Sequence, residues 1–84
     1  MPHQKIKFLK DDSCRVTVFD WSESPPEFCV NQPFKCGDII TVDGYDLSST
    51  KTSFTRLLVK PSLTNHPDGF ADIVLKKKNV EFVN

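Results

Sequence analysis

Apolar and polar residues alternate with a period of two along most of this chain, and no other sequence feature limits its fold as strongly. Successive side chains of a strand point to opposite faces, so this alternation predicts strands with one apolar face. The alternating segments are rich in β-branched and aromatic residues and are separated by Pro, Gly, Ser, Asn and Asp. They are residues 5–10, 14–21, 38–45, 54–60 and 71–77. The final residues, 78–84, are expected to form a sixth strand or a tail.

The segments between these strands predict loops. Residues 22–37 contain Pro25, Pro26 and Pro33, which exclude a regular helix, although 27–30 can form a short extended piece. With no helix to cover a sheet, a single domain spanning 1–84 must hide its faces and edges in another way. A small five-stranded barrel of the OB type is the predicted all-β fold, and an SH3-like barrel or a small β-sandwich is the alternative.

One face of the predicted strands is consistently apolar, as a narrow barrel interior requires. This inward set consists of Ile6, Phe8, Cys14, Val16, Val18, Ile40, Val42, Leu57, Val59, Ile73 and Leu75.

Composition narrows the class of protein. The 84 residues are 38% hydrophobic and 26% charged, which is typical of a globular domain. No apolar run approaches the ~18 residues of a membrane helix, and the N-terminus lacks a secretory signal, so an intracellular protein without membrane contact is expected.

Three cysteines do not suit a disulfide framework, and Cys29 and Cys36 lie too far apart for a zinc knuckle. We therefore predict reduced thiols, no metal and no cofactor.

Nothing in the sequence resembles catalytic machinery. There is no Gly-rich phosphate loop, and no pattern brings Ser, His and Asp together. A cysteine nucleophile with His66 as its base would need a deeper pocket than so small a barrel offers. The chain is predicted not to be an enzyme.

The opposite face of the strands has an unusual composition, because it combines large aromatic side chains with Arg, Lys and Thr. Such a face can stack nucleobases on its rings and meet phosphates with its cations. The outward residues are Arg15, Thr17, Phe19 and Trp21, then Thr41, Asp43 and Tyr45, then Phe54, Arg56, Leu58 and Lys60. As an alternative, the loop 22–37 covers Phe19 and Trp21 with Phe28 and Phe34.

Charge is distributed unevenly although the net charge is zero, with eleven basic and eleven acidic residues. Both ends of the chain are basic, and the segment 11–46 is acidic. If the ends meet in space they form a positive stripe for phosphates, and otherwise they only solvate the surface. Binding to nucleic acid is expected to be moderately salt-dependent.

Two stretches resemble the second-to-third-strand core of OB-fold domains. They are VTVFDWSES and FKCGDIITVDGYDL, with Asp20, Ser22, Gly37, Asp38 and Gly44 at the matching positions. GDIITVDGYDL followed by GFADIVL is similar to protection-of-telomeres-type OB domains. The resemblance implies single-stranded, telomeric-type G-rich DNA as the partner, with RNA possible, and a nuclear location.

In such families the nucleic acid lies across the second and third strands and is held by neighbouring loops. Carried onto this sequence, the resemblance implies binding by Arg15, Thr17, Phe19, Trp21, Thr41 and Tyr45, with Asn65 and His66 from the loop 61–69. Because OB folds also bind proteins, a non-catalytic protein-interaction barrel or accessory subunit is the alternative function.

Overall fold

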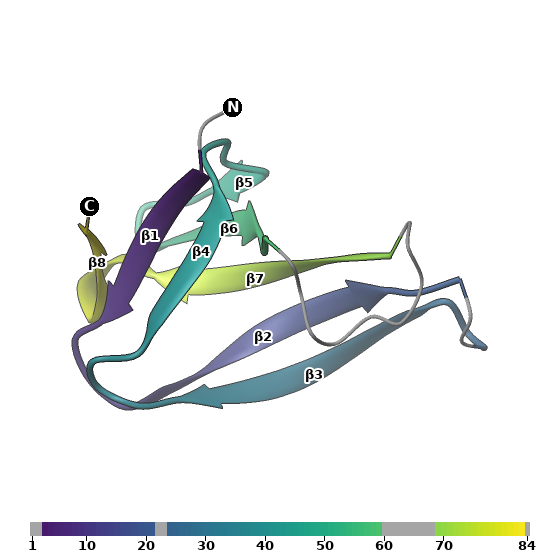
Figure 1. Cartoon of the computed structure of the whole chain (residues 1–84), viewed down its shortest axis with the longest axis horizontal. Helices are drawn as coiled ribbons and strands as arrows, with labels where there is room; N and C mark the ends of the chain where they lie inside the picture. The colour runs from purple at the N-terminus through teal and green to yellow at the C-terminus, as the bar shows by residue number, and fades with distance from the viewer. Residues whose placement is uncertain (1–2, 22–23, 60–68, 84) are drawn as a thin grey trace.

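The computed structural model describes residues 3–21, 24–59 and 69–83, and these residues form two antiparallel sheets (Figure 1). The smaller sheet has the strand order β4-β1-β8, and the larger has the order β3-β2-β7-β6-β5. The elements are β1 (His3–Phe8), β2 (Asp12–Phe19), β3 (Glu27–Phe34), β4 (Ile39–Asp43), β5 (Ser48–Ser49), β6 (Ser53–Leu57), β7 (Phe70–Lys76), the 3-10 turn η1 (Lys77–Asn79) and β8 (Val80–Val83). The prediction of an all-β fold is confirmed.

The two sheets are not closed into a barrel in the part of the chain that the structure describes. An isolated bridge between Val42 and Leu58 joins β4 to the end of β6, and the amide of Val59 donates to the carbonyl of Thr41 at 3.0 Å. On the other side of the molecule β8 pairs with β1, and β5 pairs with β6. The sheets are therefore joined by backbone hydrogen bonds between β4 and the end of β6, whereas side chains of β6 and β8 meet on the other side.

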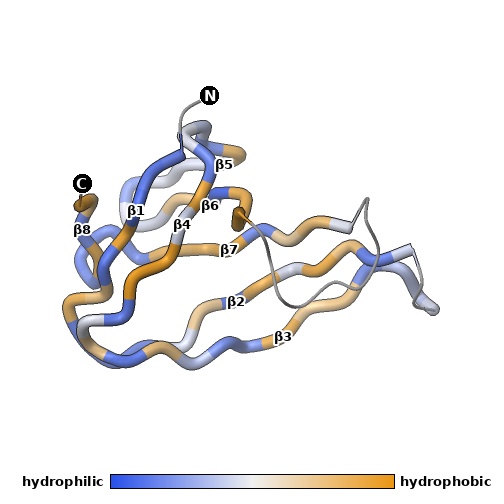
Figure 2. Tube along the Cα trace, viewed as in Figure 1, coloured by the Kyte–Doolittle hydropathy of each residue, from blue (hydrophilic) through white to orange (hydrophobic). Residues whose placement is uncertain are grey.

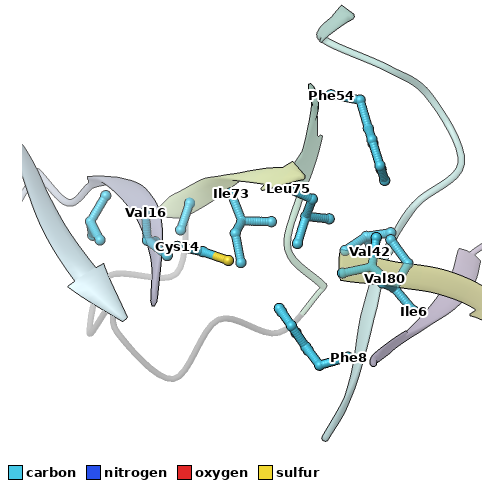
Figure 3. Close-up of a cluster of buried hydrophobic side chains, with 11 residues drawn as sticks. Ile6, Phe8, Cys14, Val16, Val42, Phe54, Ile73, Leu75 and Val80 are labelled. Atoms are coloured by element: carbon cyan, nitrogen blue, oxygen red, sulfur yellow. The ribbon is translucent and has the colours of Figure 1, made fainter. Parts of the chain in front are cut away.

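The core lies between the inner faces of the two sheets (Figure 3). Most of the residues predicted to point inward are buried there, and Figure 2 shows how hydrophobic and hydrophilic positions are interleaved along β2. Ile40 is half-buried and packs against this cluster. The buried apolar residues are Ile6, Phe8, Cys14, Val16, Val18, Val42, Phe54, Ala71, Ile73, Leu75 and Val80.

Strand β6 faces the opposite way from the prediction. Phe54 lies opposite Leu75 and Arg56 lies opposite Ile73, and residues directly opposite in an antiparallel pair share a face. Since Leu75 and Ile73 are buried, Phe54 and Arg56 are buried too. Their predicted outward orientation is wrong, and so is the predicted inward orientation of Leu57.

The residues after Leu57 also differ from their predicted positions. Leu58, which was expected to point outward, packs against the core, while Val59 is only half-buried.

Residues 27–34 form a full strand, although their segment was predicted to be a loop. All eight residues of β3 pair with β2, from Phe19 opposite Glu27 to Asp12 opposite Phe34. Pro33 is tolerated because β3 is an edge strand, where a missing backbone donor need not break a ladder. The ring of Phe34 stacks on Phe8 with centroids 4.4 Å apart and planes 8° apart.

This pairing changes the surroundings of β2. Phe28 and Phe34 pack against the core, so they do not cover Phe19 and Trp21, and the predicted covering loop is wrong. The predicted third strand corresponds to β4, which pairs with β1 in the other sheet. The second and third predicted strands are expected to lie side by side, and this prediction is also wrong, because β2 lies between β3 and β7.

The segment between β3 and β4 is held against the turn that follows β1. Gly37 donates its amide to the carbonyl of Phe8 at 2.8 Å, and its φ of 94° lies in the region that favours glycine. The amide of Cys36 donates to Asp11 Oδ1 at 2.8 Å. These bonds fix the crossing of the chain from the larger sheet to the smaller one.

The packing of β3 leads to a stability prediction. Phe34→Ala removes a half-buried ring and its stack on Phe8, and we expect the free energy of unfolding to fall by about 2 kcal/mol. Urea denaturation of this variant and of Asn31→Ala, an exposed residue of the same strand, measures the difference. Equal stabilities of the two variants would contradict the packing of residues 27–34 against the core.

Candidate nucleic-acid interface

The outer face of β2 brings together three of the residues predicted to bind nucleic acid, and a fourth follows the strand. Arg15, Thr17 and Phe19 alternate with the buried Cys14, Val16 and Val18, and Trp21 follows the end of the strand. This face continues onto both neighbouring strands through the antiparallel register. Arg15 lies opposite Asn31, Thr17 lies between Cys29 and Asp72, and Phe19 lies between Glu27 and Phe70.

Aromatic side chains occupy the end of this face where β2 finishes. The rings of Phe19 and Phe70 stack with centroids 4.6 Å apart and an interplanar angle of 21°. Phe70 is 41% exposed and Trp21 is 56% exposed, so both rings are accessible from solvent. We call Arg15, Phe19, Trp21 and Phe70 the aromatic platform.

Polar side chains form the middle of the same face. Arg15 donates from Nη2 to Cys29 Sγ at 3.4 Å, and Thr17 Oγ1 lies 3.6 Å from the same sulfur. These bonds from Thr17 and Arg15 favour the thiolate, so the pKa of Cys29 is lowered. Partial burial raises the pKa of Asp72, although its hydrogen bond with Thr17 opposes that change. Burial and hydrogen bonds thus shift the pKa values of Cys29 and Asp72 in opposite directions.

Two of the predicted site residues lie elsewhere. Thr41 is on the smaller sheet, opposite Lys5 of β1. Tyr45 follows β4 as an exposed side chain, and its amide donates to Asp43 Oδ1 at 2.9 Å. Neither residue extends the platform, because β4 and β2 belong to different sheets.

Phe54 and Arg56 point between the sheets and not onto the predicted outer face. Arg56 forms an ion pair with Asp46 through Nε, and Nη1 donates to Gln4 Oε1 at 2.6 Å and to the carbonyl of Asp43 at 2.9 Å. The guanidinium carbon lies 5.3 Å from the ring centroid of Phe54. These contacts hold a charged side chain at an inward position where an aliphatic residue would be expected.

Three further predicted residues, Lys60, Asn65 and His66, lie outside the described residues. Their part in an interface stays a prediction.

The sequence analysis did not place the neighbours of β2 on this face, among them Phe70, Cys29 and Asp72. The alternation of β7 could have found Phe70, since it precedes Asp72 and Val74 with the same period of two. Cys29 could not be placed, because the short extended piece expected at 27–30 carried no sign of which strand it pairs with. Its closeness to Arg15 depends on a strand pairing that spans fourteen residues of sequence.

Compared with protein-family models, curated proteins and solved structures, the chain matches none of them.

No group of three or more His, Cys, Asp and Glu side chains within 3–21, 24–59 and 69–83 could hold a metal ion. The same ranges contain no helix that is long and apolar enough to cross a membrane.

The environment of Cys29 leads to a prediction on thiol chemistry. Its lowered pKa increases the thiolate fraction at neutral pH, whereas burial, more than the nearby Asp12 charge, raises the pKa of Cys14 to about 11. We expect iodoacetamide to alkylate Cys29 well before Cys14. Thr17→Val should slow the reaction of Cys29 at pH 7, because it removes the hydrogen bond that lowers the pKa most.

Peptide mass spectrometry over a time course measures each cysteine separately. At pH 10 most Cys29 is ionised in both proteins, so the effect of Thr17→Val should largely disappear. A rate at pH 7 that Thr17→Val leaves unchanged would contradict the assigned hydrogen bond.

Proposed function

We propose that this chain binds single-stranded nucleic acid, and single-stranded DNA in particular, on the outer face of β2. One observation carries the proposal: the stacked pair Phe19 and Phe70 lies on the face that presents Arg15, and the exposed Trp21 follows two residues after the end of β2. Aromatic rings on a sheet face are the usual stacking positions for unpaired bases. The same face has no catalytic role in this proposal.

Electrostatics suggest how a strand would lie on the platform. Arg15 supplies a cation, whereas Glu27 and Asp72 place acidic groups beside Phe19 and Thr17. Phosphates would therefore pass on the Arg15 side, and bases would reach the rings at the other end of the face. Since each phosphate neutralised adds somewhat less than one unit to the salt slope, a shallow salt dependence is expected.

Stacking must then supply most of the affinity, at roughly 1 to 3 kcal/mol for each base. Stacking strength also gives modest sequence preferences, G-rich runs among them. We therefore propose G-rich, telomere-type DNA as the preferred strand, and a nuclear location follows from such a ligand. The proposal does not depend on a closed OB-like barrel, because one accessible sheet face is enough.

A titration of the purified protein with single-stranded oligonucleotides tests this function. The strands are G-rich and mixed-sequence DNA, with RNA of the same sequences, at two salt concentrations. We expect saturable quenching of Trp21 fluorescence, because a base that stacks on the indole changes its surroundings. The G-rich DNA should saturate at the lowest concentration.

Substitutions then locate the binding. With a labelled oligonucleotide followed by fluorescence anisotropy, Trp21→Ala and Phe19→Ala should each weaken binding about tenfold, as expected for the loss of one stacking partner. Lys78→Ala, an exposed charge outside the platform, should have a much smaller effect.

Equal losses for the three variants would contradict stacking on this face. If none of the strands alters the fluorescence, the protein-interaction function becomes the better account, with the same rings meeting a partner protein.

A further inference from the structure

A hollow of about 240 Å³ lies where the two sheets are not joined by backbone pairing. β5 and β6 of the larger sheet contribute to its wall, and β8 of the smaller sheet lies across from them. Because Phe54 and Arg56 point inward, this hollow is separate from the aromatic platform on the outer face of β2. Its lining residues are Asp46, Ser49, Phe54, Arg56, Lys77, Val80 and Phe82.

An aromatic ring and a fixed guanidinium form the wall of this hollow. The rings of Phe54 and Phe82 stack with centroids 5.7 Å apart, and the guanidinium carbon of Arg56 lies 5.1 Å from the centroid of Phe82. Phe54 is buried, but Phe82 is 52% exposed. Phe82 therefore offers a stacking surface to a planar group that enters from solvent.

Arg56 is held in place before any ligand arrives. Its side chain is only 9% exposed, and the bonds to Asp46, Gln4 and the Asp43 carbonyl start from Nε and Nη1. Its partner Asp46 keeps 44% of its side chain exposed, so this ion pair lies partly open to solvent. A pre-positioned cation in the wall of a hollow favours an anionic ligand, because little ordering remains to be done on binding.

A second cation lies at the edge of the hollow. Lys77 Nζ donates to the carbonyl of Thr50 at 2.7 Å, which holds the ammonium beside β5. The lining thus contains two bases, Arg56 and Lys77, against one acid, Asp46, and carries a net positive charge. Ser49 adds a hydroxyl that can bind a ligand oxygen.

We propose that this hollow binds a nucleobase that carries one phosphate. The base stacks on Phe82, and the phosphate lies near Arg56 and Lys77. The volume is below the range of drug-sized pockets, which limits the occupant to about one nucleotide. A free mononucleotide and the phosphorylated end of a strand share this chemistry.

A neighbouring hollow bears on the choice between these two sources. It has a volume of about 210 Å³, shares Phe82 with the first, and is lined also by His3, Gln4, Lys5 and Val83. A second nucleotide of a strand would reach Lys5 there. A free mononucleotide would leave it unaffected.

Amide chemical shifts of the full chain, followed by NMR during titration, test the proposal. The probes are adenosine 5′-monophosphate, adenosine, ribose 5-phosphate and a 5′-phosphorylated dinucleotide. We expect the monophosphate to shift the amides of Ser49, Lys77 and Phe82 in a saturable way. Adenosine and ribose 5-phosphate should each bind more weakly, since each lacks one half of the recognised group. Equal binding of ribose 5-phosphate would overturn the proposal, because surface cations alone would explain it.

Matched variants separate the hollow from the rest of the surface. Phe82→Leu keeps apolar bulk but removes the aromatic face, and it should weaken monophosphate binding about tenfold. Phe70→Ala, which changes an exposed ring of the platform, should leave it unchanged. Lys77→Gln should weaken binding more than Lys78→Gln. Thermal unfolding of each variant shows whether the fold is kept, and no difference between Phe82→Leu and Phe70→Ala in folded proteins would overturn the proposal.

The dinucleotide identifies the source of the ligand. Tighter binding than the monophosphate, with a shift at Lys5, assigns the hollow to a strand end, and equal binding assigns it to a free nucleotide. Trp21 fluorescence reports on the platform in the same samples. Failure of the platform would leave the hollow shifts intact, and failure of the hollow would leave Trp21 quenching by longer strands intact.

Discussion

The packing of two sheet faces against each other is the constraint on which this structure depends. No α-helix in the described part of the chain covers either sheet, so each sheet must cover the other. Ile6, Phe8 and Val42 of the smaller sheet pack with residues such as Ile73 and Leu75 of the larger one. Because β2 and β7 each have one face in this core, their other face is left towards solvent, and Phe19 and Phe70 of the aromatic platform lie on it.

Much of this arrangement could be predicted from local sequence. The alternation of residues 14–21 and 71–77 gave both the strands and their buried faces, since a period of two is a property of the strand itself. It also identified Arg15, Thr17 and Phe19 as a set that shares one side of the sheet. These predictions needed no knowledge of which strands are neighbours.

The rest depends on contacts between distant residues. The full length of β3 was missed, since the segment 22–37 predicted a loop with at most a short extended piece at 27–30, and only the position of β3 at a sheet edge makes Pro33 acceptable. The face of β6 was reversed because the alternation was read with Leu57 and Val59 inward, which placed Arg56 outward, whereas Asp46, Gln4 and the Asp43 carbonyl satisfy it inside. A charged side chain can be buried where ion-pair and hydrogen-bond partners surround it. The partners of Arg56 come from other segments of the chain, so the alternation within one strand does not reveal them.

The platform and the hollow between β6 and β8 illustrate two ways to build a site. The platform arises from the alternation of β2 and the start of β7, so its rings are held by strand geometry. The hollow is built from residues between Asp46 and Phe82 that meet only after both sheets have formed.

The most direct measurement of the central claim is the location of the DNA-binding surface by NMR with a G-rich single-stranded oligonucleotide. The account predicts that the largest amide shifts occur at Arg15, Thr17, Phe19, Trp21 and Phe70, with little change along β4. Shifts confined to the lysines of η1, or spread evenly over the surface, would contradict binding on the outer face of β2.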